Sequence, residues 1–215
     1  MSQSSVQRPS DALLEVRELH LWRGEHHLLR GMSFSLQAGE LLQLNGPNGV
    51  GKTSLLRIVA QLLPAESGEM LWNGQNAQRE VSGFMQALLY LGHSNALKLD
   101  LTALENLQFS AGLQRSTTHE QCLQALQALN IAQCADLPAR VLSAGQRRRV
   151  SLARLLLSSA PLWVLDEPIT NLDVAGIAAV EMLMANHLEQ GGLILAAAHQ
   201  PLLATHRGTR QLQLH

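Results

Sequence analysis

Short apolar runs alternate with amphipathic stretches along most of the chain, and this alternation predicts an α/β fold. The run Met32-Ser33-Phe34-Ser35-Leu36 alternates apolar and polar residues, which is typical of an antiparallel strand with one solvated face. Later runs such as 162–165 are continuously apolar, which is typical of buried parallel strands. The expected strands cover residues 13–19, 32–36, 41–45, 69–72, 88–91, 162–165, 193–197 and 210–214.

The pattern changes between Leu101 and Leu157, where the spacing of apolar residues predicts helices without strands. Thr118 is followed three residues later by Gln121, and this pair predicts a capping box at the start of a helix. We therefore expect an α-helical lobe of about residues 101–157, inserted into an α/β core that also has an antiparallel β portion. The expected helices cover residues 102–112, 118–129 and 145–157.

Composition is that of an ordinary globular domain. The chain has 215 residues, 46% hydrophobic content and a formal net charge of -1, so no basic field points to nucleic acid as a partner. Residues 1–10 are polar and lack the apolar core of a secretion signal, and we expect a flexible tail there, followed by one domain over 11–215. The apolar run Leu193–Ala198 is too short to cross a bilayer, so any membrane association should be peripheral. Cys122 and Cys134 form no C-x-x-C pair and are expected to be reduced core thiols.

One segment carries a specific chemical signal. Gly46-Pro47-Asn48-Gly49-Val50-Gly51-Lys52-Thr53 fits the pattern G-x-x-x-x-G-K-[ST], between the predicted strand 41–45 and a helix-compatible stretch at 53–63. Glycines without a Cβ let the backbone N–H groups turn inward around a polyphosphate. Lys52 would then reach the β- and γ-phosphates, and the Thr53 hydroxyl would be one oxygen ligand of Mg²⁺. A glycine-rich turn with a surface lysine is the competing interpretation, which the flanking strand and helix disfavour. Ser54 is included with this segment as an ATP-binding residue.

Two carboxylates follow the apolar run 162–165, namely Asp166 and Glu167. Ligands of open α/β sheets lie at the carboxyl ends of strands, so Asp166 is a candidate Mg²⁺ ligand and Glu167 a candidate for polarising the attacking water. Taken alone, the pair is equally compatible with helix capping before Pro168; the phosphate loop favours catalysis. His199 follows the apolar run that ends at Ala198, and from the same sheet edge it could hydrogen-bond a γ-phosphate.

A further run, Leu142-Ser143-Ala144-Gly145-Gln146, reads in isolation as a helix start rich in small residues. Together with Gly46–Thr53, Asp166-Glu167, Asn171-Leu172-Asp173 and His199, it resembles the ordered Walker A, signature, Walker B, D-loop and H-loop motifs of ATP-binding cassette ATPases. The resemblance extends from about residue 13 onward and implies the P-loop NTPase core of ABC ATPases. It also implies ATP hydrolysis with Mg²⁺.

The resemblance further implies that two copies close head to tail. ATP held by Lys52 of one copy would be capped by Ser143 and Gly145 of the other, because a hydroxyl and the positive end of a helix suit the γ-phosphate. The residues implied to act on the nucleotide of the partner copy are Ser143, Ala144, Gly145, Gln146 and Asp173.

Two positions depart from the family pattern. Where most members carry a glutamine that meets Mg²⁺ and links to the membrane subunit, this chain has Gly92-His93. An imidazole is a poorer Mg²⁺ ligand than an amide oxygen, so His93 is both a candidate metal residue and a candidate for coupling to a partner. The aromatic residue expected to stack on adenine is displaced, and either Trp22 or Arg23 could take that role.

The runs Tyr90–His93, Leu101–Leu107, Leu142–Val150 and His199–Leu202 narrow the resemblance. They are similar to the haem-exporter ATPases of the bacterial cytochrome c maturation system, the CcmA family. This resemblance implies an ATPase at the cytoplasmic face of the inner membrane, working as a homodimer with an integral membrane permease that docks near residues 101–108. The alternatives are an ATPase of another ABC exporter, for an antibiotic, lipid or lipoprotein, and a soluble ABC ATPase. The absence of a second cassette and of a long coiled coil disfavours the soluble protein.

Overall fold

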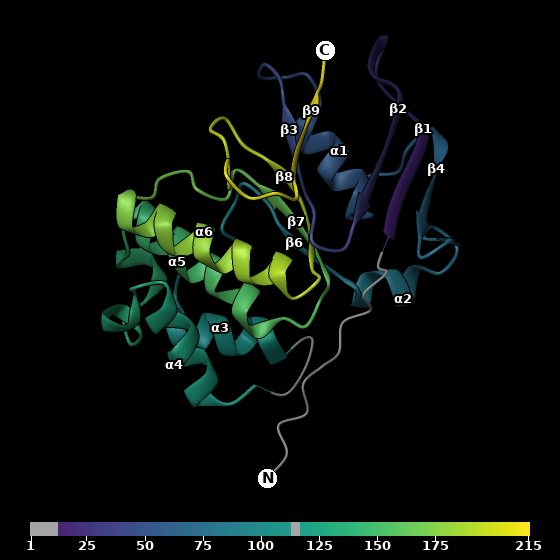
Figure 1. The fold of residues 1–215 in the computed structure, drawn as a ribbon. Coiled ribbons are helices and arrows are strands. Elements are labelled where there is room, and N and C mark those ends of the chain that lie inside the picture. The colour runs from purple at the N-terminus through teal and green to yellow at the C-terminus, as the bar shows by residue number, and fades with distance from the viewer. Residues whose placement is uncertain (1–12, 113–116) are drawn as a thin grey trace. The chain divides into compact units, whose positions relative to one another are not determined.

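The computed structural model describes residues 13–112 and 117–215 (Figure 1). The expected tail at residues 1–10 lies outside them. The chain forms two compact units. The first contains the described residues up to Tyr90 together with Ser159–Asp166 and Ala185–His215, and the second contains Leu91–Ser158 and Glu167–Met184. The division into a tail and one domain stays a prediction.

The first unit contains an antiparallel sheet in the order β2-β1-β4-β5. Its strands are β1 (Leu13–Arg23), β2 (His26–Gln37), β4 (Ser67–Trp72) and β5 (Gln75–Asn76). The predicted antiparallel portion is therefore confirmed. The first two strands are longer than predicted. Gly24, with a φ of 60°, lies in the tight turn between them, and Trp22 and His27 on either side of this turn still pair across the strands.

The same unit contains a five-stranded sheet in the order β6-β7-β8-β3-β9. The strands β3, β7, β8 and β9 run parallel, and every residue of β7 and β8 is buried, which confirms the prediction from continuous apolar runs. Helix α1 (Lys52–Val59) packs on β7 and β8. The strand bounds are Leu41–Asn45 for β3, Leu88–Leu91 for β6, Leu162–Asp166 for β7, Leu193–Ala197 for β8 and Thr209–Gln213 for β9.

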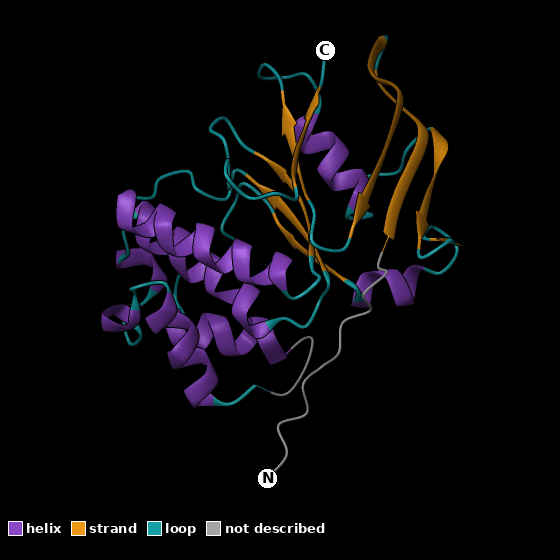
Figure 2. Ribbon diagram, in the orientation of Figure 1, coloured by secondary structure: helices purple, strands orange, loops and turns teal. Residues whose placement is uncertain are grey.

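The second unit is helical (Figure 2). Helices α3 (Ala103–Gly112), α4 (His119–Ala128) and α5 (Ala144–Ala153) pack against one another. The capping box of Thr118 and Gln121 is present. The predicted helix 145–157 is divided, because α5 ends at Ala153 and a 3-10 turn, Arg154–Leu157, follows. Two further 3-10 turns are Ala132–Cys134 and Ala139–Val141.

Two helices were not predicted. One is the short α2 (Val81–Gln86), and the other is α6 (Val174–Glu189). The sequence of α6 is apolar on most sides, so it lacks the one-sided stripe that identifies a surface helix. Cys122 and Cys134 are free and buried, as predicted, and burial raises the pKa of the Cys122 thiol.

A buried histidine closes the C-terminal end of α6 in the first unit. The imidazole of His187 stacks on the indole of Trp163 at 3.6 Å between ring centroids, and its Nε2 lies 3.0 Å from the carbonyl oxygen of Pro161. His187 is 3% exposed. A Cβ on Gly192 would overlap the imidazole, so only glycine fits beside this ring.

We predict that Gly192→Ala destabilises the protein by about 1–3 kcal/mol, because the ring is held on both sides and the core would be overpacked. Denaturant unfolding followed by fluorescence measures this change. Gly83→Ala is the matched control, since a Cβ there meets nothing within 4 Å and alanine favours the helix. Equal stability of the two variants would contradict the packing argument.

Candidate functional site

The segment Gly46–Gly51 forms a loop between β3 and α1 in the first unit. Gly46, Gly49 and Gly51 have φ values of 143°, 84° and 112°, a region that residues with a Cβ rarely adopt. The first helical bond runs from Leu55 N–H to Gly51 O at 2.8 Å, and no side chain caps the helix. The N–H groups at the start of α1 are thus available for an anion, as the sequence predicted.

Lys52 lies across this loop. Its side chain is 9% exposed, and its Nζ donates to the carbonyl oxygens of Gly46 and Pro47 at 2.6 and 3.0 Å. The ammonium group is therefore held inside the concave side of the loop, where the only acceptors it contacts are backbone carbonyls among the described residues. A phosphate group entering the loop would meet this positive charge directly.

Thr53 meets the first of the two predicted carboxylates. Its Oγ1 donates to Oδ2 of Asp166 at 3.0 Å, and Asp166 is 2% exposed. The contact forms because α1 crosses β8 and reaches β7, whose carboxyl end carries Asp166. The Thr53 hydroxyl and the Asp166 carboxylate, which belong to separate sequence motifs, are therefore direct neighbours. Oxygen donors of this kind suit Mg²⁺.

Glu167 is the first residue of the second segment of the second unit, and its backbone conformation is unusual. Its φ is 51°, an uncommon value for a residue with a side chain. Thr170 stabilises the turn, because its N–H donates to the Glu167 carbonyl at 3.3 Å and its Oγ1 donates to Oε2 of Glu167 at 3.3 Å. The carboxylate is therefore half-buried and oriented, as a residue of a functional site would be.

His199 follows β8 and is exposed, and a residue that the sequence analysis missed fixes its loop. Gln43 on β3 is 2% exposed. Its Nε2 donates to the carbonyl oxygens of Ala198 and Gln200 at 3.4 and 3.0 Å, and its Oε1 accepts from Leu202 N–H at 2.9 Å. The available signal was an amide residue among the apolar residues Leu41, Leu42 and Leu44 of the strand.

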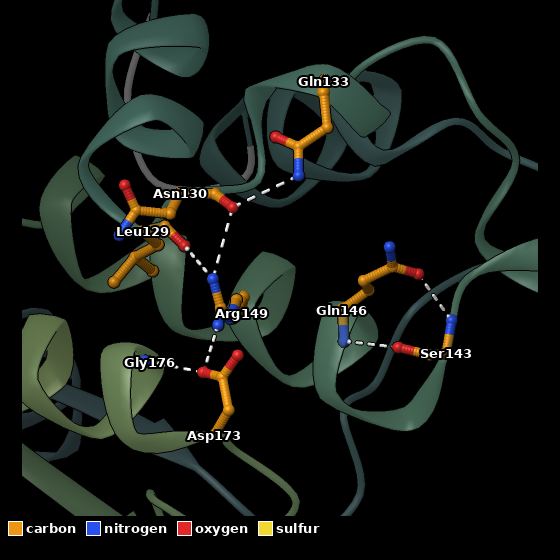
Figure 3. A network of polar contacts seen from close by, with 8 residues as sticks. All are labelled: Leu129, Asn130, Gln133, Ser143, Gln146, Arg149, Asp173 and Gly176. Carbon is orange, nitrogen blue, oxygen red and sulfur yellow. Dashed lines mark hydrogen bonds and ion pairs between the residues drawn. The ribbon is translucent and has the colours of Figure 1, made fainter.

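The run 142–146 begins helix α5 in the second unit (Figure 3). Ser143 is its N-cap and forms a capping box with Gln146, with Gln146 N–H donating to Ser143 Oγ at 3.1 Å and Ser143 N–H donating to Gln146 Oε1 at 2.8 Å. A Cβ on Gly145 would lie 2.6 Å from the carbonyl oxygen of Asn171. The start of α5 is thus packed directly on the loop that contains Asn171–Asp173.

Arg149, one helical turn after Gly145, makes a second connection to that loop (Figure 3). It forms an ion pair with Asp173 and donates to the carbonyl oxygens of Leu129 and Asn130 at 3.2 and 3.3 Å. The sequence analysis did not identify Arg149, since three consecutive arginines at 147–149 look alike. A cavity of about 380 Å³ is lined by Asn130, Ile131, Gln133, Ser143, Gly145, Gln146, Arg149, Asn171 and Asp173.

Asp173 is held as a charged group. Its Oδ1 accepts from Gly176 N–H at 2.8 Å at the start of α6. This hydrogen bond and the positive charge of Arg149 lower the pKa of Asp173, although desolvation opposes them. A lowered folded-state pKa means that the stabilisation is complete above the ordinary pKa and is lost only as the pH falls through the folded value. The contact is therefore intact at neutral pH.

The remaining predicted positions are placed as follows. Trp22 is 44% exposed and stacks on His27 at 4.1 Å between ring centroids. His27 in turn lies 2.9 Å from His20 between ring nitrogens, and desolvation followed by the neighbouring positive groups lowers the pKa of His27. Arg23 and His93 are exposed.

Within residues 13–112 and 117–215 there is no group of three or more His, Cys, Asp or Glu side chains that could hold a metal ion, nor a helix long and apolar enough to cross a membrane.

Comparison with known proteins identifies the family to which the chain belongs. A family model described as ABC transporter matches residues 29–170. The chain is 46% identical over 202 residues to the "Cytochrome c biogenesis ATP-binding export protein CcmA" of Escherichia coli O157:H7, covering 94% of this chain and 96% of that protein. It is 43% identical over 203 residues to the protein of the same name from Vibrio cholerae serotype O1, covering 94% and 98%.

Solved structures share the fold. A putative ABC transporter ATP-binding protein from Pyrococcus furiosus matches with a TM-score of 0.82 at 24% identity, covering 94% of this chain and 98% of that one. An ATP-binding cassette solved as a dimeric post-hydrolysis state with ADP and Pi matches with a TM-score of 0.80 at 21% identity, covering 94% and 96%. The chain belongs to the ABC transporter family of ATP-hydrolysing subunits, among the cytochrome c biogenesis ATP-binding export proteins.

Proposed function

We propose that this protein is the Mg²⁺-dependent ATPase subunit of a cytochrome c biogenesis transporter of the haem-export type. In this proposal it acts as a head-to-tail homodimer on an integral membrane permease, at the cytoplasmic face of the bacterial inner membrane. The relatives named for cytochrome c biogenesis export support the pathway. The observation that carries the chemistry is the hydrogen bond between Thr53 and Asp166 beside the phosphate loop.

The two residues of this hydrogen bond fit Mg²⁺. A hydroxyl and a buried carboxylate are hard oxygen donors, which this ion prefers. Thr53 and Asp166 would therefore hold the metal, which when bound neutralises charge on the β- and γ-phosphates. His93 offers an exposed nitrogen, a poor donor for Mg²⁺. We assign His93 to coupling with the permease rather than to the metal.

The phosphates would enter the loop Gly46–Gly51, where Lys52 exchanges its carbonyl acceptors for phosphate oxygens. Glu167 follows Asp166 in the chain, so its carboxylate is placed one residue beyond the proposed Mg²⁺ ligand. From there it would accept a proton from the attacking water. His199, in the loop that Gln43 fixes, would donate a hydrogen bond to the γ-phosphate.

The partner copy would supply the start of α5. Ser143 Oγ already accepts from Gln146 N–H, so its hydroxyl hydrogen can donate to a phosphate oxygen. Ser143 is also the N-cap of α5, so a phosphate bound there would lie at the positive end of the helix dipole. The side chains of Gln146 and Asp173 are engaged within their own chain. We therefore propose that these two residues shape the segment, while Ser143, Ala144 and Gly145 approach the nucleotide.

The two candidates for stacking on adenine differ in the face of the sheet that they occupy. Leu21 is 6% exposed and pairs with Leu29, and Leu29 lies beside Gly51 of the phosphate loop, since a Cβ on Gly51 would be 2.9 Å from Leu29 Cδ2. The pairing of β1 with β2 shifts between Leu21 and Trp22, but alternation along β1 itself would put Arg23 on the face of Leu21 and Trp22 on the other. We propose that Arg23 stacks on adenine.

We predict that Glu167→Gln retains ATP binding, nearly abolishes turnover and traps a dimer with ATP, because the carboxylate that activates water is lost while Lys52 is intact. Phosphate release and size-exclusion chromatography with ATP measure the two effects. Lys52→Ala is the contrasting variant and should lose ATP binding. Turnover by Glu167→Gln at the unmodified protein's rate would refute the assignment.

We predict that Arg23→Ala weakens ATP binding about tenfold, since stacking on a base is worth on the order of 1–3 kcal/mol. Trp22→Ala should bind ATP within about twofold of the unmodified protein. Equilibrium titration with a fluorescent ATP analogue compares them. Weaker binding by Trp22→Ala alone would reverse the choice between the two residues.

The docking region expected at residues 101–108 stays a prediction, and side-chain exposure narrows the residues that are accessible to a partner there. Leu104 is 6% exposed, and Glu105 forms a capping box with Thr102 through bonds of 2.8 and 3.1 Å, so both stabilise α3 itself. The second unit exposes several apolar side chains, and those nearest to this segment along the chain are Leu99 and Phe109, 54% and 50% exposed, with Lys98 Nζ 4.5 Å from the Phe109 ring centroid. We propose that these two residues contact the permease.

We predict that the double variant Leu99→Ser, Phe109→Ser loses co-purification with the membrane permease while its own ATPase rate stays within about twofold. Affinity capture of the tagged permease from detergent-solubilised membranes measures the association. Leu62→Ser is the control, because Leu62 is 59% exposed in the first unit. Undiminished capture of the double variant would rule out this surface.

A further inference from the structure

A second arginine of helix α5, Arg148, is buried in the second unit. Arg148 is only 3% exposed to solvent. A guanidinium group so far from water must have its N–H donors satisfied by acceptors. The acceptors given by the structure come from two other segments, the turn after β7 and the loop after β6. Arg148 thus joins three segments of the chain.

The first set of acceptors lies in the turn that carries the candidate catalytic carboxylate. Arg148 Nη2 donates to the carbonyl oxygen of Glu167 at 2.8 Å, and its Nε donates to that of Pro168 at 3.3 Å. These are the carbonyls of two consecutive residues, so the planar fork of the guanidinium binds two successive peptide units of the turn. Glu167 has the left-handed φ of 51°, a conformation that persists only where its surroundings hold it.

The second set lies in the loop after β6 that contains His93. Arg148 Nη1 donates to the carbonyl oxygen of Gly92 at 3.0 Å and to Oδ1 of Asn95 at 3.4 Å. These two residues flank His93, which is exposed. One rigid group therefore contacts both the loop around His93 and the backbone of Glu167.

We propose that Arg148 is a positioning residue that orients the Glu167 carboxylate and makes its orientation depend on the conformation of the loop 92–95. The guanidinium is planar and its donors point in fixed directions, so a shift of the loop must move or break the bonds to the Glu167 turn. Arg148 would act through the backbone carbonyls of the Glu167 turn, to which it donates. This inference rests on the proposed catalytic role of Glu167.

Lysine at this position separates charge from geometry. Its single ammonium keeps the positive charge but cannot reach four acceptors in a plane. We expect Arg148→Lys to lower kcat for ATP hydrolysis by about 10- to 100-fold, as a small misplacement of a catalytic group does, with KM for ATP within about twofold. Arg148→Gln should show the same split. Rates are expressed per nucleotide-binding site, measured by titration, so that unfolded protein is not counted.

Arg140→Lys is the matched control, because Arg140 belongs to the same unit but forms an exposed ion pair with Asp100 at 2.9 Å; its kcat should be unchanged. A merely structural role for Arg148 would lower the number of binding sites and leave kcat per site unchanged. That result would overturn the proposal.

A double-mutant cycle tests the route through Glu167. In single-turnover measurements on the full chain, Arg148→Lys should have little further effect in the Glu167→Gln background, because residues that act as one unit are not additive. Effects that multiply fully would show that Arg148 acts elsewhere. Unmodified turnover by Glu167→Gln alone would instead refute the catalytic role of Glu167, so the two failures are distinguishable.

The loop is tested in the same way. Asn95→Ala should lower kcat in the same direction as Arg148→Lys but less, since its contact is the longest of the set. The two substitutions together should cost no more than Arg148→Lys alone. Independent, multiplying effects, or a normal kcat in Asn95→Ala, would remove the loop from the proposal.

Discussion

The hydrogen bond between Thr53 and Asp166 joins residues 113 positions apart in the chain. It can form only if β3 and β7 run parallel, so that the phosphate loop after β3 and the carboxylate at the end of β7 lie at one sheet edge, and only if α1 crosses the intervening β8. The buried strands supply this alignment, and the apolar core under α1 stabilises it. The placement of the proposed Mg²⁺ ligands is therefore a consequence of sheet topology.

Much of this arrangement could be predicted because its signals are local. Continuous apolar runs identified the parallel strands, alternation identified the antiparallel sheet, and Thr118 with Gln121 identified a helix start. The bounds of β1 and β2 were wrong because cross-strand pairing near Gly24 extends strands beyond their apolar residues. Helix α6 was missed because its apolar residues do not gather on one side.

The groups that hold the site in place could not be predicted, since their roles depend on contacts between distant segments. Gln43 reads as an interruption of a strand, yet it forms hydrogen bonds across the loop that carries His199. Arg147, Arg148 and Arg149 are consecutive and chemically identical. Only the turn of the helix separates them, with Arg147 donating to the carbonyl of Leu142 at 2.8 Å, Arg148 buried against Glu167 and Arg149 paired with Asp173.

A buried arginine is a costly way to stabilise a fold, because apolar residues of similar volume often do so better. The cost of burying Arg148 is offset by hydrogen bonds that an apolar residue could not make, which go to backbone carbonyls and to Asn95 Oδ1. Because carbonyl groups belong to the backbone, the contacts to Gly92, Glu167 and Pro168 depend on where these segments lie rather than on their side chains. The left-handed Glu167 is sensitive to such a constraint, because its uncommon backbone conformation persists only where the surrounding groups hold it.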